Sequence, residues 1–551
     1  MQLLRFACRV HRTLIQHCSQ RLASTVPQVC IVGSGPTAFY TAQYLLRRHN
    51  AVQVDMFEKL PAPFGLLRYG VAPDHPEVKN LINTFTEVAK NRRFQFVGNV
   101  TVGKEIRLRE LQRAYSAVIL AYGASQDRML NVPGEQLPGV LSAKKLVGWY
   151  NGAPGLGNFQ PDLDCETVAI VGMGNVSLDV ARILLSPVNR LKNTDIPEPV
   201  MAVLSTSRIR RAVLIGRRGP LQVAFTLKEV RELVHLTSSS ADPLSASSST
   251  ADERQKIRVR LLPPQVITDT MGSGKTVAKI ISDLPRPRRR LTQFLIDYDK
   301  TTPSQCEKHA GKFCDFLFLR SPVRIWSREC TNGGTTIGTI SPNADDALTA
   351  TRSVVGKIEL CVNQLKGPVS SHQTASVIPD APTEFIDCGL VVRSIGYRSV
   401  QIDPDLPFDD KYGVIKSLDL SGRVAEPLHR PAGSDASLLF CAGWAKRGAV
   451  GVIVDAAVDA RETSQAVLSD LAKAELKADQ RVTNKPGLDS VLSILNERGV
   501  RPVSFADWER VDAFERMTGK SLGKPREKLT TVESILRTAF AEVQEHRHGT
   551  T

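Results

Sequence analysis

The sequence predicts an α/β fold built from two Rossmann-like dinucleotide-binding domains. An apolar run, a glycine-rich turn and a helical run follow one another at residues 28–49, and the same order recurs at residues 167–185. Strand, tight turn and helix in that order form the phosphate-binding unit of a parallel α/β sheet. The 551 residues are 42% hydrophobic and 23% charged, an ordinary globular composition that is long enough for two or more cores.

The first unit begins with the strand-like run VPQVCIV and turns at GSGPTA. Gly33 allows the tight turn, and Gly35 lets the backbone approach a pyrophosphate at the helix N-terminus. The next strand, AVQVDMFE, ends at Glu58, whose carboxylate can accept hydrogen bonds from ribose hydroxyls and repels a 2′-phosphate. The unit is therefore typical of a site for FAD or NAD rather than NADP. Ala38 replaces the third glycine, and a chance turn is the alternative interpretation.

The second unit runs from TVAIV through Gly172, Gly174 and Asn175 into a helix. Its next strand, RAVLIGRR, ends in Arg217 and Arg218 instead of an acid. Two planar guanidinium groups provide the bidentate donors that a 2′-phosphate needs, so this unit predicts NADP(H). The alternative is a solvated arginine pair on a loop. Together the two units indicate a non-covalent FAD that stays bound and an NADPH that visits, a pair suited to moving a hydride from nicotinamide to flavin.

The first 25 residues have the composition of a leader. Residues 1–54 contain no Asp or Glu, and Arg5, Arg9, Arg12 and Arg21 interrupt the apolar residues of the leader. This pattern is typical of a mitochondrial transit peptide rather than a secretory signal. Part of the formal net charge of +15 belongs to the leader, and the rest indicates an acidic partner. The sequence has no run of about 18 apolar residues, so it predicts no membrane-spanning helix.

The ten cysteines are scattered, and no two of them form a C-x-x-C pair. This argues against a zinc site, an iron–sulfur cluster and a redox-active disulfide, so no metal site is predicted. The string MGSGKT, residues 271–276, ends like a phosphate-binding P-loop, but Asp269 stands where the first glycine must be. We therefore expect no ATP site.

The chain resembles the adrenodoxin reductase family of mitochondrial NADPH:ferredoxin reductases, which belongs to the glutathione-reductase-like flavoprotein class. The resemblance covers about residues 28–529 and rests on long motifs in a fixed order: GSGPTAFYTAQYLL, PAPFGLLRYGVAPDHPEVKN, VGMGNVSLDVARILL, GRRGPLQVAFTLKEVREL, FLRSP, RSIGYRS, GWAKRGAVGVI and GKPREKL. It implies an oxidoreductase of class 1.18.1 that passes single electrons from FAD to an acidic, adrenodoxin-like [2Fe–2S] ferredoxin. The electrons would feed mitochondrial cytochrome P450 or iron–sulfur and haem biosynthesis.

The resemblance also assigns contacts residue by residue. The flavin contacts fall on Gly33, Gly35, Thr37, Glu58, Leu66, Val102, Trp444, Gly451, Val452 and Ile453. The NADP contacts fall on Gly172, Met173, Gly174, Asn175, Arg217, Arg218, Glu229 and, at the nicotinamide end, Gly451. The family mostly has proline at Ala449 and alanine at Thr37 and Ser177, and these departures are small. A helix predicted to start near Gly451 would direct its N-terminal amides at the flavin ring and stabilise its reduced, anionic form.

His75 and Asp179 lie near the flavin in the family, which implies a proton role for both. The sequence also allows a plainer interpretation. In that interpretation His75 is a structural loop histidine, and Asp179 is a helix residue that fixes the interface between the domains. Both interpretations stay open at this point.

The domain organisation follows from the two units and from three polar stretches. We expect a transit peptide at 1–25, the first part of the FAD domain at 27–150, the NADP domain at 165–384, and the second part of the FAD domain with C-terminal helices at 385–551. Residues 236–255 form a low-complexity insertion predicted to be a surface loop. Residues 330–351 and 367–383 are similar hairpin-tip or loop insertions.

An acidic ferredoxin needs a basic docking face. The string RPRRR, residues 286–290, is a dense basic block, and the family's ferredoxin-contacting arginines fall on Arg231, Arg286 and Arg290. A solvated cationic loop is the alternative. The resemblance further implies a monomer in the mitochondrial matrix, with at most peripheral contact with the inner membrane and no nucleic-acid partner. A non-catalytic flavoprotein that senses NADPH and binds a partner is the competing function.

Overall fold

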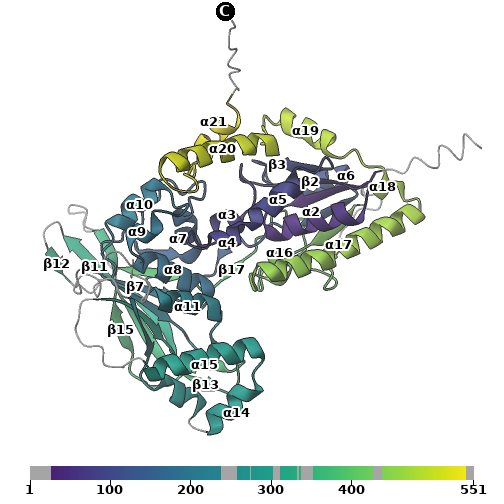
Figure 1. Cartoon of the computed structure of the whole chain (residues 1–551). Helices are drawn as coiled ribbons and strands as arrows, with labels where there is room; N and C mark the ends of the chain where they lie inside the picture. The colour runs from purple at the N-terminus through teal and green to yellow at the C-terminus, as the bar shows by residue number, and fades with distance from the viewer. Residues whose placement is uncertain are drawn as a thin grey trace, which may run out of the picture.

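The computed structural model describes residues 26–236, 257–272, 275–301, 311–331, 334–336, 352–425 and 437–541. These residues form two halves, each around a parallel sheet, with two C-terminal helices over the junction between them (Figure 1). The predicted transit peptide and nearly all of the insertions predicted at 236–255 and 330–351 lie outside the described residues. None of the described helices combines the length and the apolar character that crossing a membrane requires.

The first sheet is parallel throughout, with the strand order β20–β4–β1–β2–β3. Its strands are β1 (Gln28–Val32), β2 (Gln53–Phe57), β3 (Phe94–Val97), β4 (Ala117–Leu120) and β20 (Leu438–Cys441). Continuous apolar runs such as AVIL in β4 are buried on both faces, as expected for a parallel sheet between layers of other elements. The sheet is complete only when β20 returns from the C-terminal part of the chain to pair with β4.

Helices cover this sheet and continue to the C-terminus. They are α2 (Pro36–Arg48), α3 (Leu66–Tyr69), α4 (Pro76–Lys79), α5 (Leu81–Ala89), α6 (Leu108–Ala114), α16 (Trp444–Arg447), α17 (Ile453–Leu476), α18 (Gln480–Thr483), α19 (Leu488–Glu497), α20 (Phe505–Ser521) and α21 (Val532–Ala539). On one face α2 lies beside α17, and small residues such as Ala38, Ala42 and Ala466 let the two helices pack closely. On the other face α6 and α19 bury Leu111 and Leu495.

The second sheet is also parallel, with the strand order β6–β16–β7–β8–β10–β9. Its strands are β6 (Val140–Ser142), β7 (Thr167–Val171), β8 (Arg211–Ile215), β9 (Ile257–Leu262), β10 (Lys312–Leu317) and β16 (Leu390–Arg393). Two of these strands, β6 and β16, lie outside the range 165–384 predicted for the second domain. Chain order gives no signal for this, because partners in a parallel sheet can be far apart in sequence.

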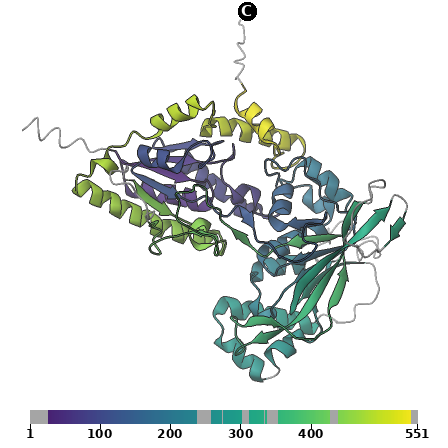
Figure 2. The same cartoon turned by 180° about the vertical axis from the view of Figure 1, so that it is seen from behind.

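Different layers cover the two faces of the second sheet. One face packs against helices: α7 (Ala143–Tyr150), α8 (Asn175–Leu185), α9 (Val188–Leu191), α10 (Glu198–Ser205), the short turn η1 (Pro220–Gln222), α11 (Leu227–His235), α13 (Val266–Met271), α14 (Lys275–Asp283) and α15 (Arg286–Thr301). The other face packs against an antiparallel sheet of β11 (Arg320–Thr331), β12 (Gly334–Thr336), β13 (Arg352–Lys366), β14 (Thr374–Val377) and β15 (Glu384–Asp387). Figure 2 shows this antiparallel sheet on the side of the second half that lies away from the first sheet.

The chain passes between the halves twice, and short strands mark the crossings. β5 (Gln126–Asp127), on the outward crossing, pairs in antiparallel fashion with β17 (Tyr397–Arg398), on the return. A further small ladder, β18 (Phe408–Asp409) with β19 (Val414–Ile415), follows the return. The paired crossings link the two halves.

Candidate functional site

The first glycine-rich turn lies between β1 and α2 and leaves the helix N-terminus open. Gly33 has a φ of 103°, and a Cβ at this position would lie 2.6 Å from the carbonyl oxygen of Ala121. The Gly33 N–H donates to the Phe57 carbonyl at 2.7 Å, which ties the turn to β2. At Gly35 a Cβ would meet no atom within 4 Å, and no side chain caps α2. The free amides of this helix start can therefore receive a phosphate.

Glu58, at the end of β2, is held beside that turn. Its carboxylate is nearly buried, and one oxygen accepts hydrogen bonds from the Ser34 N–H at 2.9 Å and the Ser34 hydroxyl at 2.7 Å. The other oxygen accepts from the Leu60 N–H at 3.1 Å. Because each carboxylate oxygen has two lone pairs, this arrangement fixes the side chain and leaves acceptor capacity for a ribose hydroxyl. The same negative charge disfavours a 2′-phosphate here.

Two loops converge on the first turn. A Cβ at Gly65, the residue before α3, would lie 3.1 Å from the Gly35 Cα, so the loop that leads to Leu66 crosses the turn directly. A Cβ at Gly443 would lie 2.5 Å from the Thr37 hydroxyl oxygen, which places the start of α16 against α2. The structure thus brings three of the predicted flavin-binding segments together around one helix N-terminus.

The remaining predicted flavin residues extend this surface. Val102 is buried in the same apolar cluster as Val32, at the end of β1. Trp444, the first residue of α16, stacks on Tyr397 with ring centroids 6.1 Å apart. The helix expected near Gly451 begins at Ile453, because Gly451 has a φ of 93° and the Val452 N–H donates to the Asp455 carboxylate at 2.7 Å. The Val452 amide is therefore engaged within the chain.

The second glycine-rich turn repeats the geometry of the first. Gly172 has a φ of 136°, a Cβ there would lie 2.1 Å from the Ser394 carbonyl oxygen, and its N–H donates to the Ile215 carbonyl at 2.9 Å. At Gly174 a Cβ would meet nothing within 4 Å, and no side chain caps α8. This helix start is as open as that of α2, which is the arrangement a second pyrophosphate requires.

The other residues of this turn bind it to the segment that leads into α11. The Met173 carbonyl accepts a hydrogen bond from the Ala224 N–H at 2.9 Å. The Asn175 side-chain carbonyl accepts one from the Thr226 N–H at 2.8 Å. α11 carries Glu229, so the turn and this glutamate are held in a fixed relation.

Three guanidinium groups gather beyond the end of β8. Arg217 is exposed and Arg218 is partly buried, and burial together with the neighbouring Arg217 lowers the pKa of Arg218. Arg288, from α15, donates to the Val223 carbonyl at 2.6 Å, and its own pKa is lowered by burial and by Arg218. In the described part of the chain no carboxylate forms an ion pair with any of the three. The excess positive charge fits a phosphate dianion. The sequence indicated the first two arginines, but Arg288 was indistinguishable from its neighbours in RPRRR.

His75 and Asp179 do come together, in a charged cluster on the seam between the halves. Arg182, fully buried on α8, donates to both oxygens of Asp74 at 2.6 and 3.0 Å and to Asp179 at 2.8 Å. The donor and acceptor atoms of His75, Asp179 and Glu229 lie within 4.8 Å of one another. The first half contributes Asp74 and His75, and the second half contributes the other members. The guanidinium of Arg182 supplies positive charge among these carboxylates.

Glu232 is a member of this cluster that the sequence did not indicate. Its carboxylate lies 2.7 Å from Nε2 of His75, whereas the Glu229 carboxylate lies 4.0 Å away. Burial raises the pKa of Asp179, and burial followed by the charge of Asp179 raises the pKa of Glu229. Both carboxylates are therefore shifted toward the protonated form. The only sequence signal for Glu232 was its position on an amphipathic helix, three residues after Glu229.

The predicted docking arginines lie on α11 and α15. Arg231 and Arg290 line one hollow of about 530 Å³, together with Arg289, Gln293 and Phe294 among others. The Arg231 guanidinium lies 5.4 Å from the ring centre of Phe294. Arg286 is exposed at the first residue of α15, one turn before Arg290. Among the described residues no carboxylate forms an ion pair with Arg231, Arg286 or Arg290, so this face carries uncompensated positive charge.

Comparison with known proteins agrees with this architecture. Residues 27–213 match the family model described as pyridine nucleotide-disulphide oxidoreductase. The chain is 43% identical to mitochondrial NADPH:adrenodoxin oxidoreductases of Salvelinus fontinalis, over 94% of this chain and 91% of that protein, and of Homo sapiens, over 93% and 91%. It is also similar to a solved structure of Mycobacterium tuberculosis FprA in complex with NADPH, with a TM-score of 0.75 at 34% identity, covering 94% of this chain and all of that one.

Proposed function

The chain belongs to the NADPH:adrenodoxin oxidoreductase family, and we infer that it is a flavoprotein that carries electrons from NADPH through FAD to a ferredoxin. The observation that carries this inference is the pair of open glycine-rich turns with opposite neighbours. One turn has the carboxylate of Glu58 beside it, and the other is followed by Arg217 and Arg218. When bound, NADPH supplies a hydride, and FAD accepts it and releases electrons one at a time.

The residues of the chain fit the two coenzymes in different ways. The amides at the start of α2 receive the FAD pyrophosphate, and Glu58 accepts the ribose hydroxyls. The amides at the start of α8 receive the NADPH pyrophosphate, while Arg217 and Arg218 bind the 2′-phosphate. The loops that carry Leu66 and Trp444 converge on the first turn and enclose the flavin. Leu66 is 41% exposed beside the first turn, where an FAD bound at α2 would cover it.

For the partner, we propose an acidic [2Fe–2S] ferredoxin of the adrenodoxin type that docks on Arg231, Arg286 and Arg290. The relatives are named as mitochondrial, and the arginine-rich leader supports localisation to the mitochondrial matrix. We propose a monomer with at most peripheral contact with the inner membrane. The electrons then feed mitochondrial cytochrome P450 or iron–sulfur and haem biosynthesis.

Two roles are proposed for the seam cluster. Burial raises the pKa of Asp179, whose carboxylate lies within 4.8 Å of a ring nitrogen of His75, and this supports a proton role for the two residues. The contacts of Arg182 with Asp74 and Asp179 equally support a role in fixing the halves. The pH dependence of the rate of flavin reduction by NADPH distinguishes the two roles. If His75 has the proton role, His75→Gln moves one limb of the pH–rate profile to another pH. If its role is structural, the substitution lowers the rate by the same factor at every pH.

The proposed partner is tested by reversing the charge of the docking face. Arg231→Glu with Arg290→Glu should lower the rate of ferredoxin-dependent cytochrome c reduction by about 10-fold or more at low salt, and less at high salt, because steering by charge is screened. Reduction of ferricyanide by NADPH does not need this face and should stay near the wild-type rate. The control is Lys104→Glu with Arg208→Glu, which changes the net charge equally at two strongly exposed side chains.

Each outcome bears on the proposal. Loss in both assays would place the damage at the coenzyme sites, and no loss in either would place the docking face elsewhere. A wild-type protein that binds both coenzymes but reduces neither acceptor would favour the non-catalytic, NADPH-sensing alternative.

A further inference from the structure

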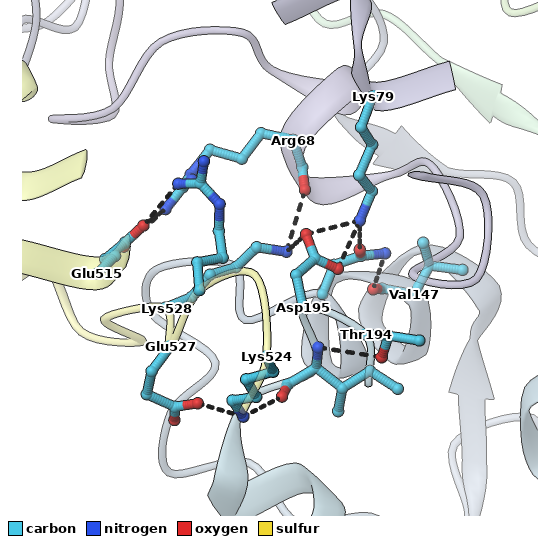
Figure 3. Close-up of polar contacts among 12 residues, drawn as sticks. Arg68, Lys79, Val147, Thr194, Asp195, Glu515, Lys524, Glu527 and Lys528 are labelled. Carbon is cyan, nitrogen blue, oxygen red and sulfur yellow. Dashed lines mark hydrogen bonds and ion pairs between the residues drawn. The ribbon is translucent and has the colours of Figure 1, made fainter. Parts of the chain in front are cut away.

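A buried cluster of charged side chains joins the two halves at the C-terminal segment 524–528, here called the C-terminal clamp. At its centre is the fully buried side chain of Lys528, whose Nζ lies 2.8 Å from Oδ2 of Asp195 and 3.5 Å from the Arg68 carbonyl oxygen (Figure 3). Lys79 reaches the same carboxylate at 2.8 and 2.9 Å. One carboxylate of the second half therefore holds an ammonium group of the first half and one of the C-terminal segment.

The clamp bonds to the second half at three residues, Asp195, Ile196 and Glu198. Lys524, also buried, donates to the Ile196 carbonyl at 2.8 Å and to the Glu198 carboxylate at 2.7 Å. The Glu198 N–H, at the start of α10, donates to the Glu527 carboxylate at 2.9 Å. Residues 195–198 thus make backbone as well as side-chain bonds to the clamp, and backbone bonds fix position more tightly than side-chain contacts alone.

The other end of the clamp is anchored to α20 and to the segment of Gly65 and α3, here called the flavin loop. Arg68, on α3, donates to both oxygens of the buried Glu515 at 2.7 and 2.6 Å, and its guanidinium lies 4.7 Å from the ring centre of Trp508. The Leu529 N–H donates to Glu515 at 3.0 Å, which ties the end of the clamp to the same carboxylate. The clamp is therefore continuous from α20 through α3 to the loop before α10.

This point of contact lies close to the coenzyme machinery in sequence and in space. α3 starts at Leu66, and α4, which carries Lys79, starts directly after His75. The NADP-binding turn belongs to the second half, so the gap between nicotinamide and flavin depends on how the two halves are set against each other. Ion pairs this deeply buried add little net stability compared with apolar contacts, but they are directional. Such a set is suited to fixing a geometry.

We propose that Lys528 is a positioning residue for hydride transfer. It holds the flavin loop and the second half at the separation at which the nicotinamide of NADPH meets the flavin. The inference rests on the proposed function, because it concerns the approach of NADPH to FAD. A displacement of about 1 Å between reacting groups can slow a reaction by roughly 10²-fold. A small relaxation at the clamp is therefore sufficient to show in the rate.

Lys528→Met tests the proposal in the full-length holoprotein. Methionine keeps the unbranched shape, and Asp195 keeps its ion pair with Lys79, so the variant leaves no unpaired charge. We expect hydrogen–deuterium exchange to be faster at the amides of residues 66–79 and 195–198. The first-order rate of flavin reduction at saturating NADPH should fall about 10-fold or more, with FAD content and NADPH affinity within about twofold of wild type. Lys520→Met, an exposed lysine on α20, is the matched control.

The outcomes separate this inference from the function on which it rests. If Lys528→Met reduces its flavin at the wild-type rate, the positioning role is refuted. A loss of NADPH affinity equal to the loss of rate would refute it as well, since that pattern indicates a damaged binding site. If wild type itself is not reduced by NADPH, the proposed function fails first. Should Lys528→Met not fold, Lys524→Met removes the contacts with residues 196 and 198 and the ion pair with Glu527, and it should give the same pattern at smaller size.

Discussion

The clearest test of the coenzyme assignment is the double replacement Arg217→Ala with Arg218→Ala. A hydrogen bond to a charged group contributes about 1.5–3 kcal/mol, so losing two of them removes about 3–6 kcal/mol from the binding of a 2′-phosphate. This corresponds to a fall of roughly 10² to 10⁴ in kcat/KM for NADPH. Arg288 remains beside the site and keeps part of the attraction, so we expect a value near the lower limit.

The assay is steady-state reduction of ferricyanide with each coenzyme in turn. NADH lacks the 2′-phosphate, and its kcat/KM should therefore stay within about twofold of wild type, so that the preference for NADPH collapses. Arg208→Ala, at the opposite end of β8 and 75% exposed, is the control and should leave both coenzymes unaffected. A double variant that keeps its preference for NADPH would refute the assignment. An equal loss with NADPH and NADH would show that the change had damaged the fold of the turn instead.

Three further predictions use other parts of the structure. Glu58→Arg should weaken FAD retention during purification, because it places a cation and a bulky group where the ribose binds; retention at the wild-type level would contradict that placement. Arg288→Met should raise the KM for NADPH and leave that for NADH unchanged. Burial raises the pKa of Asp55 to about 7, so folding takes up a proton and the free energy of unfolding falls as pH rises from about 4 to about 7. Asp55→Asn should therefore raise the free energy of unfolding at pH 8 by up to roughly 4 kcal/mol, which thermal unfolding would show as a higher Tm. At pH 4 the substitution should have little effect. An equal gain in Tm at pH 4 and pH 8 would refute this account.

The sequence predicted the two glycine-rich turns and the helices after them because their geometry is encoded locally. Gly33 and Gly172 are needed at φ values that other residues avoid, and each is followed by a helix whose apolar spacing is visible in a short window. The discriminating residues Glu58 and Arg217 follow from the next strand in order. The first unit runs from residue 28 to residue 58 and the second from residue 167 to residue 218, so each lies within one short stretch of the chain, and the local pattern is sufficient.

The sequence predicted less well which strands belong to which sheet. β16 pairs with β7 across more than two hundred residues, and neither strand carries a label that names its partner. The helix predicted to start near Gly451 does so at Ile453, and the local pattern does not show that Asp455 caps the Val452 amide. Glu232 and Asp195 on the seam, and Arg288 beside Arg218 in the second half, were likewise missed, because each acquires its role from a residue on a distant element.

The seam differs in kind from the interiors of the two halves. Each of the four apolar clusters covers one face of one sheet, so the hydrophobic effect holds each half together by itself. Between the halves lie the charged set around Arg182 and Asp179 and the charged set around Lys528 and Asp195. Apolar contacts are non-directional and tolerate sliding, whereas ion pairs with fixed donors and acceptors do not. A protein that brings two coenzymes together from separate halves needs a defined distance more than it needs extra adhesion, and a charged seam supplies that distance.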